Sequence, residues 1–113
     1  MSDKSKPSFY KKIEKQFPDI INAVEKLGTV LRKAGPLDEK TTHLIQLAAA
    51  AARQSEGSVC SHTRRALQAG ASPEEIYHAL LLLVSTIGFP QTMAAISWSQ
   101  DVLEKKSKSK KGN

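Results

Sequence analysis

The chain has 113 residues, 40% of them hydrophobic and 25% charged, which suits one globular domain with a modest core. Its net charge is +6, but most of the excess lies in the lysine-rich residues 104–113. No aromatic residue is interleaved with these lysines, so a nucleic-acid-binding surface is not expected.

Composition also bears on location and fold class. The single cysteine excludes an internal disulfide and fits a reducing compartment. No signal peptide is visible, and the longest apolar run, Ala79–Val84, is far too short to span a bilayer, so we expect a cytoplasmic protein with no membrane contact. Aromatic residues make up only 5% of the chain, so the core must come from aliphatic residues, which favours packed helices over strands.

Two helices are predicted at the start of the chain. Residues 8–16 form a short basic helix, and Pro18 fits the first turn of the next one. That second helix ends at Gly35 and Pro36, and its apolar residues share one face: Ile20, Ile21, Val24, Leu27 and Leu31. We therefore assign residues 1–17 to a basic N-terminal segment.

The next predicted helix is rich in alanine. It begins after Asp38, a good N-cap residue, and runs to about Gln54. The run of alanines over residues 48–52 leaves small side chains on every face. Because small residues let neighbouring helices approach closely, we expect this helix to be internal.

Two further helices are marked by capping residues. Gly57 can end one helix and Ser58 can cap the next, which runs to Gly70. Residues 72–75, Ser-Pro-Glu-Glu, combine an N-cap serine, a proline at the first helical position and a capping-box glutamate. The helix that they open is apolar all round over residues 79–84, so we expect burial on more than one side, with another subunit covering the second side.

The end of the chain completes an all-α prediction. Gly88 to Pro90 break the apolar helix, and a last helix runs from about Pro90 to Lys106. No segment shows the alternation of a strand, so we expect five or six helices and no sheet. Residues 18–103 form a single helical domain in this prediction, and the Lys-rich residues 104–113 form a disordered tail.

The helix that starts near Ser58 carries the candidate chemistry. Ser58 lies four residues before His62 and Arg65 three after it, so these side chains share a helix face, while Cys60 points elsewhere. Glu56 precedes the helix and can fold over its first turn, where the helix dipole favours anions and lowers thiol pKa values. The stretch therefore suits a carboxylate substrate, a thiolate, or a general acid or base.

Other polar residues are weaker candidates. Arg64 is a second, less favoured cation for an anionic substrate, and His43 and His78 lie beside apolar stripes from which they can line a pocket. A metal site made by Cys60 and His62 is disfavoured, because two residues this far apart on one helix point roughly 200° from each other. We expect neither a metal nor a cofactor.

Two blocks of sequence carry a family resemblance. They read LDEKTTHLIQLAAAAA and HTRRALQAGASPEEI, and a small-residue break and a final helix follow them. Their order between about Leu37 and Leu103 resembles the carboxymuconolactone decarboxylase or alkylhydroperoxidase D-like proteins. This resemblance implies an orthogonal bundle of helices and a homo-oligomer, a trimer or hexamer, with sites near the subunit contacts.

The resemblance also sets expectations for the site. Peroxidase members resemble E…C-x-x-C-x-x-x-H, and aligning their histidine with His62 puts their two cysteines at Ser55 and Ser58 and their glutamate at His43. A dithiol needs two thiols to cycle through an internal disulfide, and Cys60 is at neither position. Decarboxylases of the family lack the cysteine pair, retain the histidine, and act on a lactone that bears a carboxylate.

Three functions remain open, and the first is favoured. It is a non-redox enzyme for a small carboxylate or lactone, with His62 as general base or acid, Glu56 as its partner and Arg65 as the anion clamp. The second is a residual thiol peroxidase that uses Cys60 and an external thiol. The third is a non-enzymatic oligomer that binds a small molecule in the inherited pocket.

Overall fold

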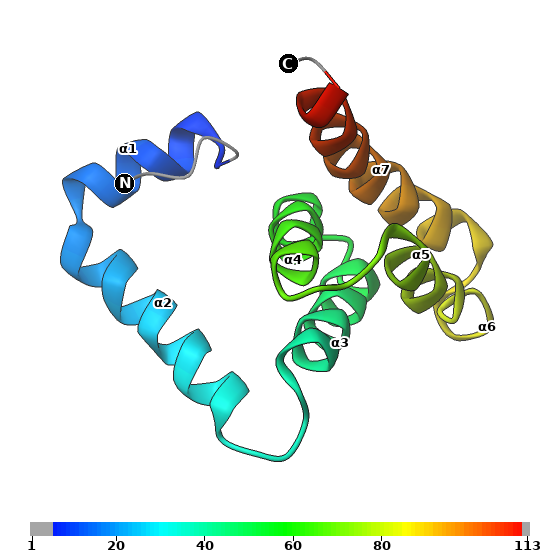
Figure 1. Cartoon of the computed structure of the whole chain (residues 1–113), viewed down its shortest axis with the longest axis horizontal. Coiled ribbons are helices and arrows are strands. Elements are labelled where there is room, and N and C mark those ends of the chain that lie inside the picture. Colours follow the sequence, from blue (N-terminus) through cyan, green and yellow to red (C-terminus); the bar gives the residue numbers. More distant parts are fainter. Residues whose placement is uncertain (1–5, 112–113) are drawn as a thin grey trace. The chain divides into compact units, whose positions relative to one another are not determined.

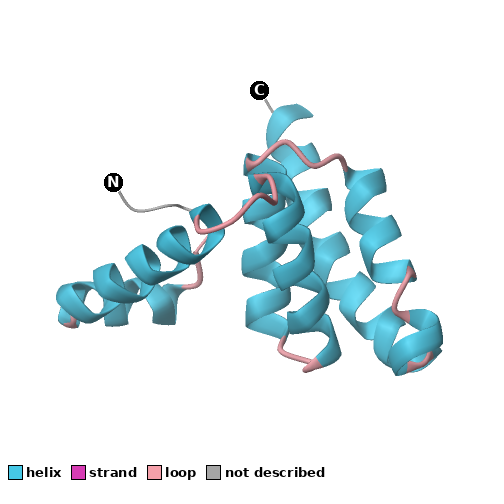
Figure 2. Ribbon diagram, turned by 90° about the horizontal axis from the view of Figure 1, so that it is seen from below, coloured by secondary structure: helices cyan, strands magenta, loops and turns pink. Residues whose placement is uncertain are grey.

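The chain is helical throughout the part that the structure describes. This computed structural model describes the backbone of residues 6–111 and the side chains of residues 6–105. Six longer helices and one single-turn helix follow one another within those bounds, with no strand among them (Figures 1 and 2). The chain divides between Leu37 and Asp38 into two compact units, each with its own contacts.

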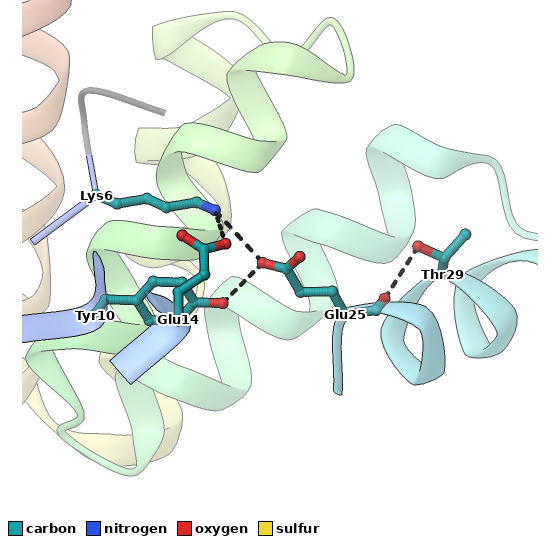
Figure 3. A network of polar contacts seen from close by, with 5 residues as sticks. All are labelled: Lys6, Tyr10, Glu14, Glu25 and Thr29. Atoms are coloured by element: carbon teal, nitrogen blue, oxygen red, sulfur yellow. Dashed lines mark hydrogen bonds and ion pairs between the residues drawn. The ribbon is translucent and has the colours of Figure 1, made fainter. Parts of the chain in front are cut away.

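The first unit is a pair of helices. α1 spans Ser8–Gln16 and α2 spans Pro18–Lys33, with Phe17 between them and Pro18 at the start of α2 as predicted. Polar contacts link the two helices (Figure 3), because the hydroxyl of Tyr10 donates to a carboxylate oxygen of Glu25 at 2.8 Å. The ammonium of Lys6 lies 3.1 Å from Glu14 and 3.6 Å from Glu25. Burial and the bond to Glu25 raise the pKa of Tyr10.

The apolar stripe of this unit is not buried within the unit. Neither α1 nor α2 has a buried residue. The large apolar side chains exposed here are those of Phe9, Ile13, Phe17, Ile20, Val24, Leu27, Val30, Leu31 and Leu37. The predicted amphipathic pattern of α2 is therefore present, but the unit does not bury it within itself.

The second unit holds the remaining helices. They are α3 (Glu39–Ala52), α4 (Glu56–Gln68), α5 (Pro73–Leu81), α6 (Val84–Ile87) and α7 (Phe89–Lys111). Two of the predicted caps are confirmed: Asp38 accepts a bond from the Thr41 amide at 2.7 Å, and Ser72 and Glu75 form a capping box. The prediction that Gly57 ends a helix and Ser58 caps the next is wrong, because α4 begins at Glu56 with Ser55 as its N-cap residue, and both residues lie inside it. Gly70 and Gly88 have φ of 99° and 97°, a conformation that suits glycine where α4 and α6 end.

The core of the second unit is built largely from small residues. α3 packs against α4, α5 and α7, and α4 also packs against α7. The buried apolar residues are Leu47, Ala50, Ala51, Val59, Ala66, Ala71, Ile76, Leu80, Ala95 and Leu103. Half of them are alanines, so the helices approach closely. α3 is internal on one face only, since Ala49 and Ala52 are exposed.

Two further predicted helices differ from the observed ones. The helix expected over residues 73–87 breaks after Leu81, where the Leu83 amide bonds to Leu80 instead of continuing the regular α pattern. Leu81 and Leu82 are 50% and 62% exposed, so their apolar run is buried on one side only. α7 continues past the predicted end at Lys106, because residues 91–111 contain neither glycine nor proline to stop it.

The predicted disordered tail, residues 104–113, is accordingly helical as far as Lys111. Its last two residues, 112 and 113, lie outside the described part of the chain. The proposed domain limits at residues 18 and 103 stay predictions. No helix in the described part of the chain has both the length and the apolar character needed to cross a membrane.

The close packing of α3 can be tested at two neighbouring alanines. Ala51 is fully buried and Ala52 is exposed. Ala51→Leu should lower the free energy of unfolding by about 1–3 kcal/mol, because the added atoms overfill a packed core. Ala52→Leu should change it by less than about 0.5 kcal/mol. Urea denaturation of both variants measures the difference, and equal losses would contradict the packing described here.

Candidate functional site

A pocket opens where α3 ends and α4 begins. Its volume is about 570 Å³. All of its lining residues belong to the second unit: Gln46, Ala49, Ala50, Arg53, Gln54, Ser55, Ser58 and His62. Three of them, Ser55, Ser58 and His62, belong to the segment in which the sequence predicted the chemistry, and the other five lie on or just after α3.

The α3 wall of the pocket follows from helical spacing. Gln46, Ala49, Ala50 and Arg53 stand at positions i, i+3, i+4 and i+7, which share one helix face. The two alanines leave room, and the two polar residues frame it. The side-chain oxygen of Gln46 is buried without a hydrogen-bond partner in the described part of the chain, so it can accept a bond from a ligand.

The turn between α3 and α4 forms the floor of the pocket. Gln54 has a φ of 57°, a left-handed conformation that is uncommon outside glycine. Its side-chain amide donates to the carbonyl of Ala51 at 2.8 Å and to that of Gln91 at 3.1 Å, so the turn is tied to both α3 and α7. Ser55 follows as the N-cap residue of α4, and its side chain makes no capping bond.

The α4 wall brings Ser58 and His62 to the same pocket. They lie one helical turn apart, and both line it together with Ser55. These three positions are the ones that the family resemblance matches to the two cysteines and the histidine of peroxidase members. The structure therefore places hydroxyl groups, rather than thiols, beside the imidazole.

A second histidine lies close to His62. His43, on α3, is 4% exposed, and its ring centroid is 6.3 Å from that of His62, with the planes tilted by 43°. Its Nε2 atom lies 4.0 Å from a carboxylate oxygen of Glu39, one turn earlier on the same helix. His43 is not among the residues that line the pocket, but it contacts one that does.

Cys60 faces a different part of the molecule. It is partly buried, and its Sγ lies 3.7 Å from the carbonyl oxygen of Trp98 on α7. Burial, and secondly the carboxylate of Glu56, raise the pKa of the Cys60 thiol. A raised pKa reduces the thiolate fraction on which nucleophilic attack depends. Cys60 also does not line the pocket among the residues described.

The other predicted residues lie outside the pocket lining of the described chain. Glu56 is exposed in the first turn of α4, and His78 is exposed in the last turn of α5. Arg64 and Arg65 are partly buried on α4. The cation in the described lining is instead Arg53. The sequence places Arg53 on the same helix face as Gln46, but it does not show that this face lies opposite α4. Within the described residues, no group of three or more His, Cys, Asp and Glu side chains is arranged to hold a metal ion.

The pocket is therefore suited to proton transfer and to small anions. It combines one imidazole, one guanidinium, two hydroxyls and two amides around a small apolar wall. An imidazole can take or give a proton near neutral pH, and a guanidinium binds carboxylates. The hydroxyl and amide groups add hydrogen bonds that can orient an oxygen-rich ligand.

Comparison with known proteins agrees with this fold. A model of the carboxymuconolactone decarboxylase family matches residues 18–101. A crystal structure of a carboxymuconolactone decarboxylase family protein from Legionella pneumophila, in its apo form, is 29% identical in sequence. The match covers 86% of this chain and 87% of that one, with a TM-score of 0.71. No curated protein matches the sequence significantly.

The raised pKa of Cys60 has a measurable consequence. Iodoacetamide should alkylate the folded protein more slowly at pH 7 than the same protein in guanidinium chloride, and the rate should keep rising above the pH of an ordinary thiol. Glu56→Gln should speed the reaction, because it removes a negative charge near the sulfur. Equal rates in the folded and unfolded states at neutral pH would contradict this description of Cys60.

Proposed function

The chain belongs to the carboxymuconolactone decarboxylase family, and we propose that it is a non-redox enzyme that acts on a small carboxylate or lactone by acid–base chemistry. One observation carries the proposal. His62 lines the pocket beside two serines at the positions where peroxidase members have thiols, whereas the lone cysteine lies against α7. The described lining of the pocket therefore offers an imidazole and two hydroxyls, groups that can move protons.

His62 is the general base or acid in this proposal. Its imidazole lines the pocket, where a substrate proton can be taken up and returned to the product. Ser55 and Ser58 can donate hydrogen bonds to a carbonyl or developing enolate oxygen, which stabilises negative charge as a transition state forms. Glu56, in the first turn of the same helix, remains a predicted proton-donating partner.

Arg53 replaces Arg65 and Arg64 as the proposed anion clamp. It is the cation that the structure puts on the pocket wall, at the far end of the face that begins with Gln46. A guanidinium holds a carboxylate through two parallel bonds, so Arg53 can fix the orientation of a substrate against His62. The buried oxygen of Gln46 suits a hydroxyl or a water that donates a bond.

The two alternatives use different features of the chain. A thiol peroxidase would need Cys60 to be a reactive thiolate, and burial beside Trp98 works against that. A non-enzymatic binding protein would use the same pocket without turnover. Measured turnover separates this last alternative from the enzyme, because both predict binding of a small anion.

We also propose that the protein is a homo-oligomer, a trimer or hexamer. Large apolar side chains are exposed in the second unit as well as the first: Ile45, Leu81, Leu82, Phe89 and Met93. Such residues together are unusual on a monomer surface and support subunit contacts. Light scattering of the full chain gives the mass that decides this.

The role of His62 can be tested with Cys60 as the matched control. In a panel of carboxylated lactones followed by NMR, His62→Ala should lower kcat/KM by about 100-fold to 10,000-fold, the usual contribution of a general acid or base. Cys60→Ser should leave it nearly unchanged. Full activity in His62→Ala would refute the proposal, and activity that disappears with Cys60 would favour the peroxidase.

The anion clamp can be tested by comparing two arginines. Arg53→Ala should weaken the affinity for a carboxylate ligand by about tenfold, because a charge-assisted hydrogen bond is lost at an exposed edge. Arg65→Ala removes the same charge outside the lining of the pocket and should have a much smaller effect. Calorimetric titration measures both. A larger loss with Arg65→Ala would restore the assignment made from sequence.

A further inference from the structure

Two histidines, His43 and His62, lie close together at the pocket, and the carboxylate of Glu39 lies beside the first of them. His43 is buried, with its Nε2 atom 4.0 Å from Glu39, and its ring centroid is 6.3 Å from that of His62. The side chain of Glu39 is 65% exposed. Glu39 at the surface, the buried His43 and His62 in the pocket wall are therefore successive neighbours.

Electrostatic repulsion couples the two histidines. Two positive charges at roughly this separation in a protein repel each other enough to shift a titration by about one pH unit or more. The second proton therefore binds at a lower pH than the first. Which ring carries the first proton depends on the charges nearest to each.

The described charges beside each ring differ in sign. Glu39 attracts a proton to His43, which opposes the cost of burying the charge. Arg53 lines the same pocket as His62 and opposes a second positive charge there. Lys40 and Glu75 form an ion pair at 2.9 Å, so their charges largely cancel. The other described titratable or charged side chains on helices packed against α3 are Glu56, Cys60, Arg64 and Arg65 on α4, Glu74, Tyr77 and His78 on α5, and Asp101, Glu104 and Lys105 on α7.

We propose that His43 is a positioning residue. Of the two histidines, His43 is protonated first, because Glu39 lies beside it, and its positive charge keeps His62 neutral and basic in the pocket. When His62 takes a proton from a substrate, the new charge expels the proton of His43 past Glu39 to water. The pair then holds one proton, as it did before, and the substrate proton has in effect passed to solvent. The role of this coupling in catalysis rests on the proposed function, whereas the coupling of the two histidine titrations does not.

The experiment is an NMR titration of the three imidazoles in the full chain. Only His43, His62 and His78 contribute signals, and His→Gln variants assign them. His43→Gln should raise the midpoint of His62 by about one pH unit, because a neighbouring positive charge is gone. Glu39→Gln should lower the midpoint of His43, because its carboxylate partner is gone. The His78 signal is the internal reference.

A matched control distinguishes a local effect from a general one. Glu74→Gln makes the same change at an exposed glutamate in the first turn of α5, and it should move neither His43 nor His62. An unmoved His62 midpoint in folded His43→Gln would overturn the proposal. If that buried substitution prevents folding, Glu39→Gln at the surface decides, and an unmoved His43 midpoint overturns it.

The outcome is separable from that of the proposed function. The titration needs no substrate, so coupled midpoints without any turnover would sustain the histidine pair and reject the enzyme. If turnover is found, the acid limb of its pH profile should move to higher pH in His43→Gln, since neutral His62 is the active form. An acid limb that stays in place while the His62 midpoint moves would overturn the role of His43 in catalysis.

Discussion

The close contact between α3 and α4 is the constraint on which the site depends. Alanines on the buried face of α3 let α4 approach, and the fully buried side chains of Leu47 and Val59 fill the space that remains. Toward the end of α3, the face that lines the pocket carries only alanines and polar residues. Side chains of the two helices do not fill the gap between them there. The pocket is that gap, closed at one end by the strained turn at Gln54.

The same contact determines which groups meet. A helix presents residues three and four apart to one partner, so only a few residues form each wall of the pocket. One wall includes Gln46 and Arg53, and the other includes Ser58 and His62. Residues between them on α4 must face other helices. Cys60 does so and reaches the carbonyl oxygen of Trp98 on α7, where burial raises the pKa of its thiol. The pocket wall holds His62 together with Ser55 and Ser58, which stand at the positions that the family resemblance matches to cysteines.

Charge is distributed along α3 in a way that serves this pocket. Glu39 stands at its start and Arg53 just past its end, which is the orientation that the helix dipole favours. The buried His43 lies near the acidic end, while the pocket opens at the basic end. One helix therefore supplies a negative environment for one imidazole and a positive environment for the other.

Much of the fold could be read from the sequence alone, because the signals are local. The caps at Asp38 and Ser72, the glycines at 70 and 88, and the helical periodicity between them depend on neighbours in the chain, and the all-helical class and the family follow from them. The sequence also singled out His62 and Ser58, since both lie on one face of one helix.

Only the tertiary structure decided which residues line the pocket. Arg53 and Gln46 line the same pocket as His62, and no spacing within α4 contains that information. The position of Arg53 in the pocket wall, the contact of Cys60 with α7 and the approach of His43 to His62 all depend on how separate helices pack. A sequence determines its helix faces through local periodicity, whereas the identity of the partner across each face is a property of the folded chain.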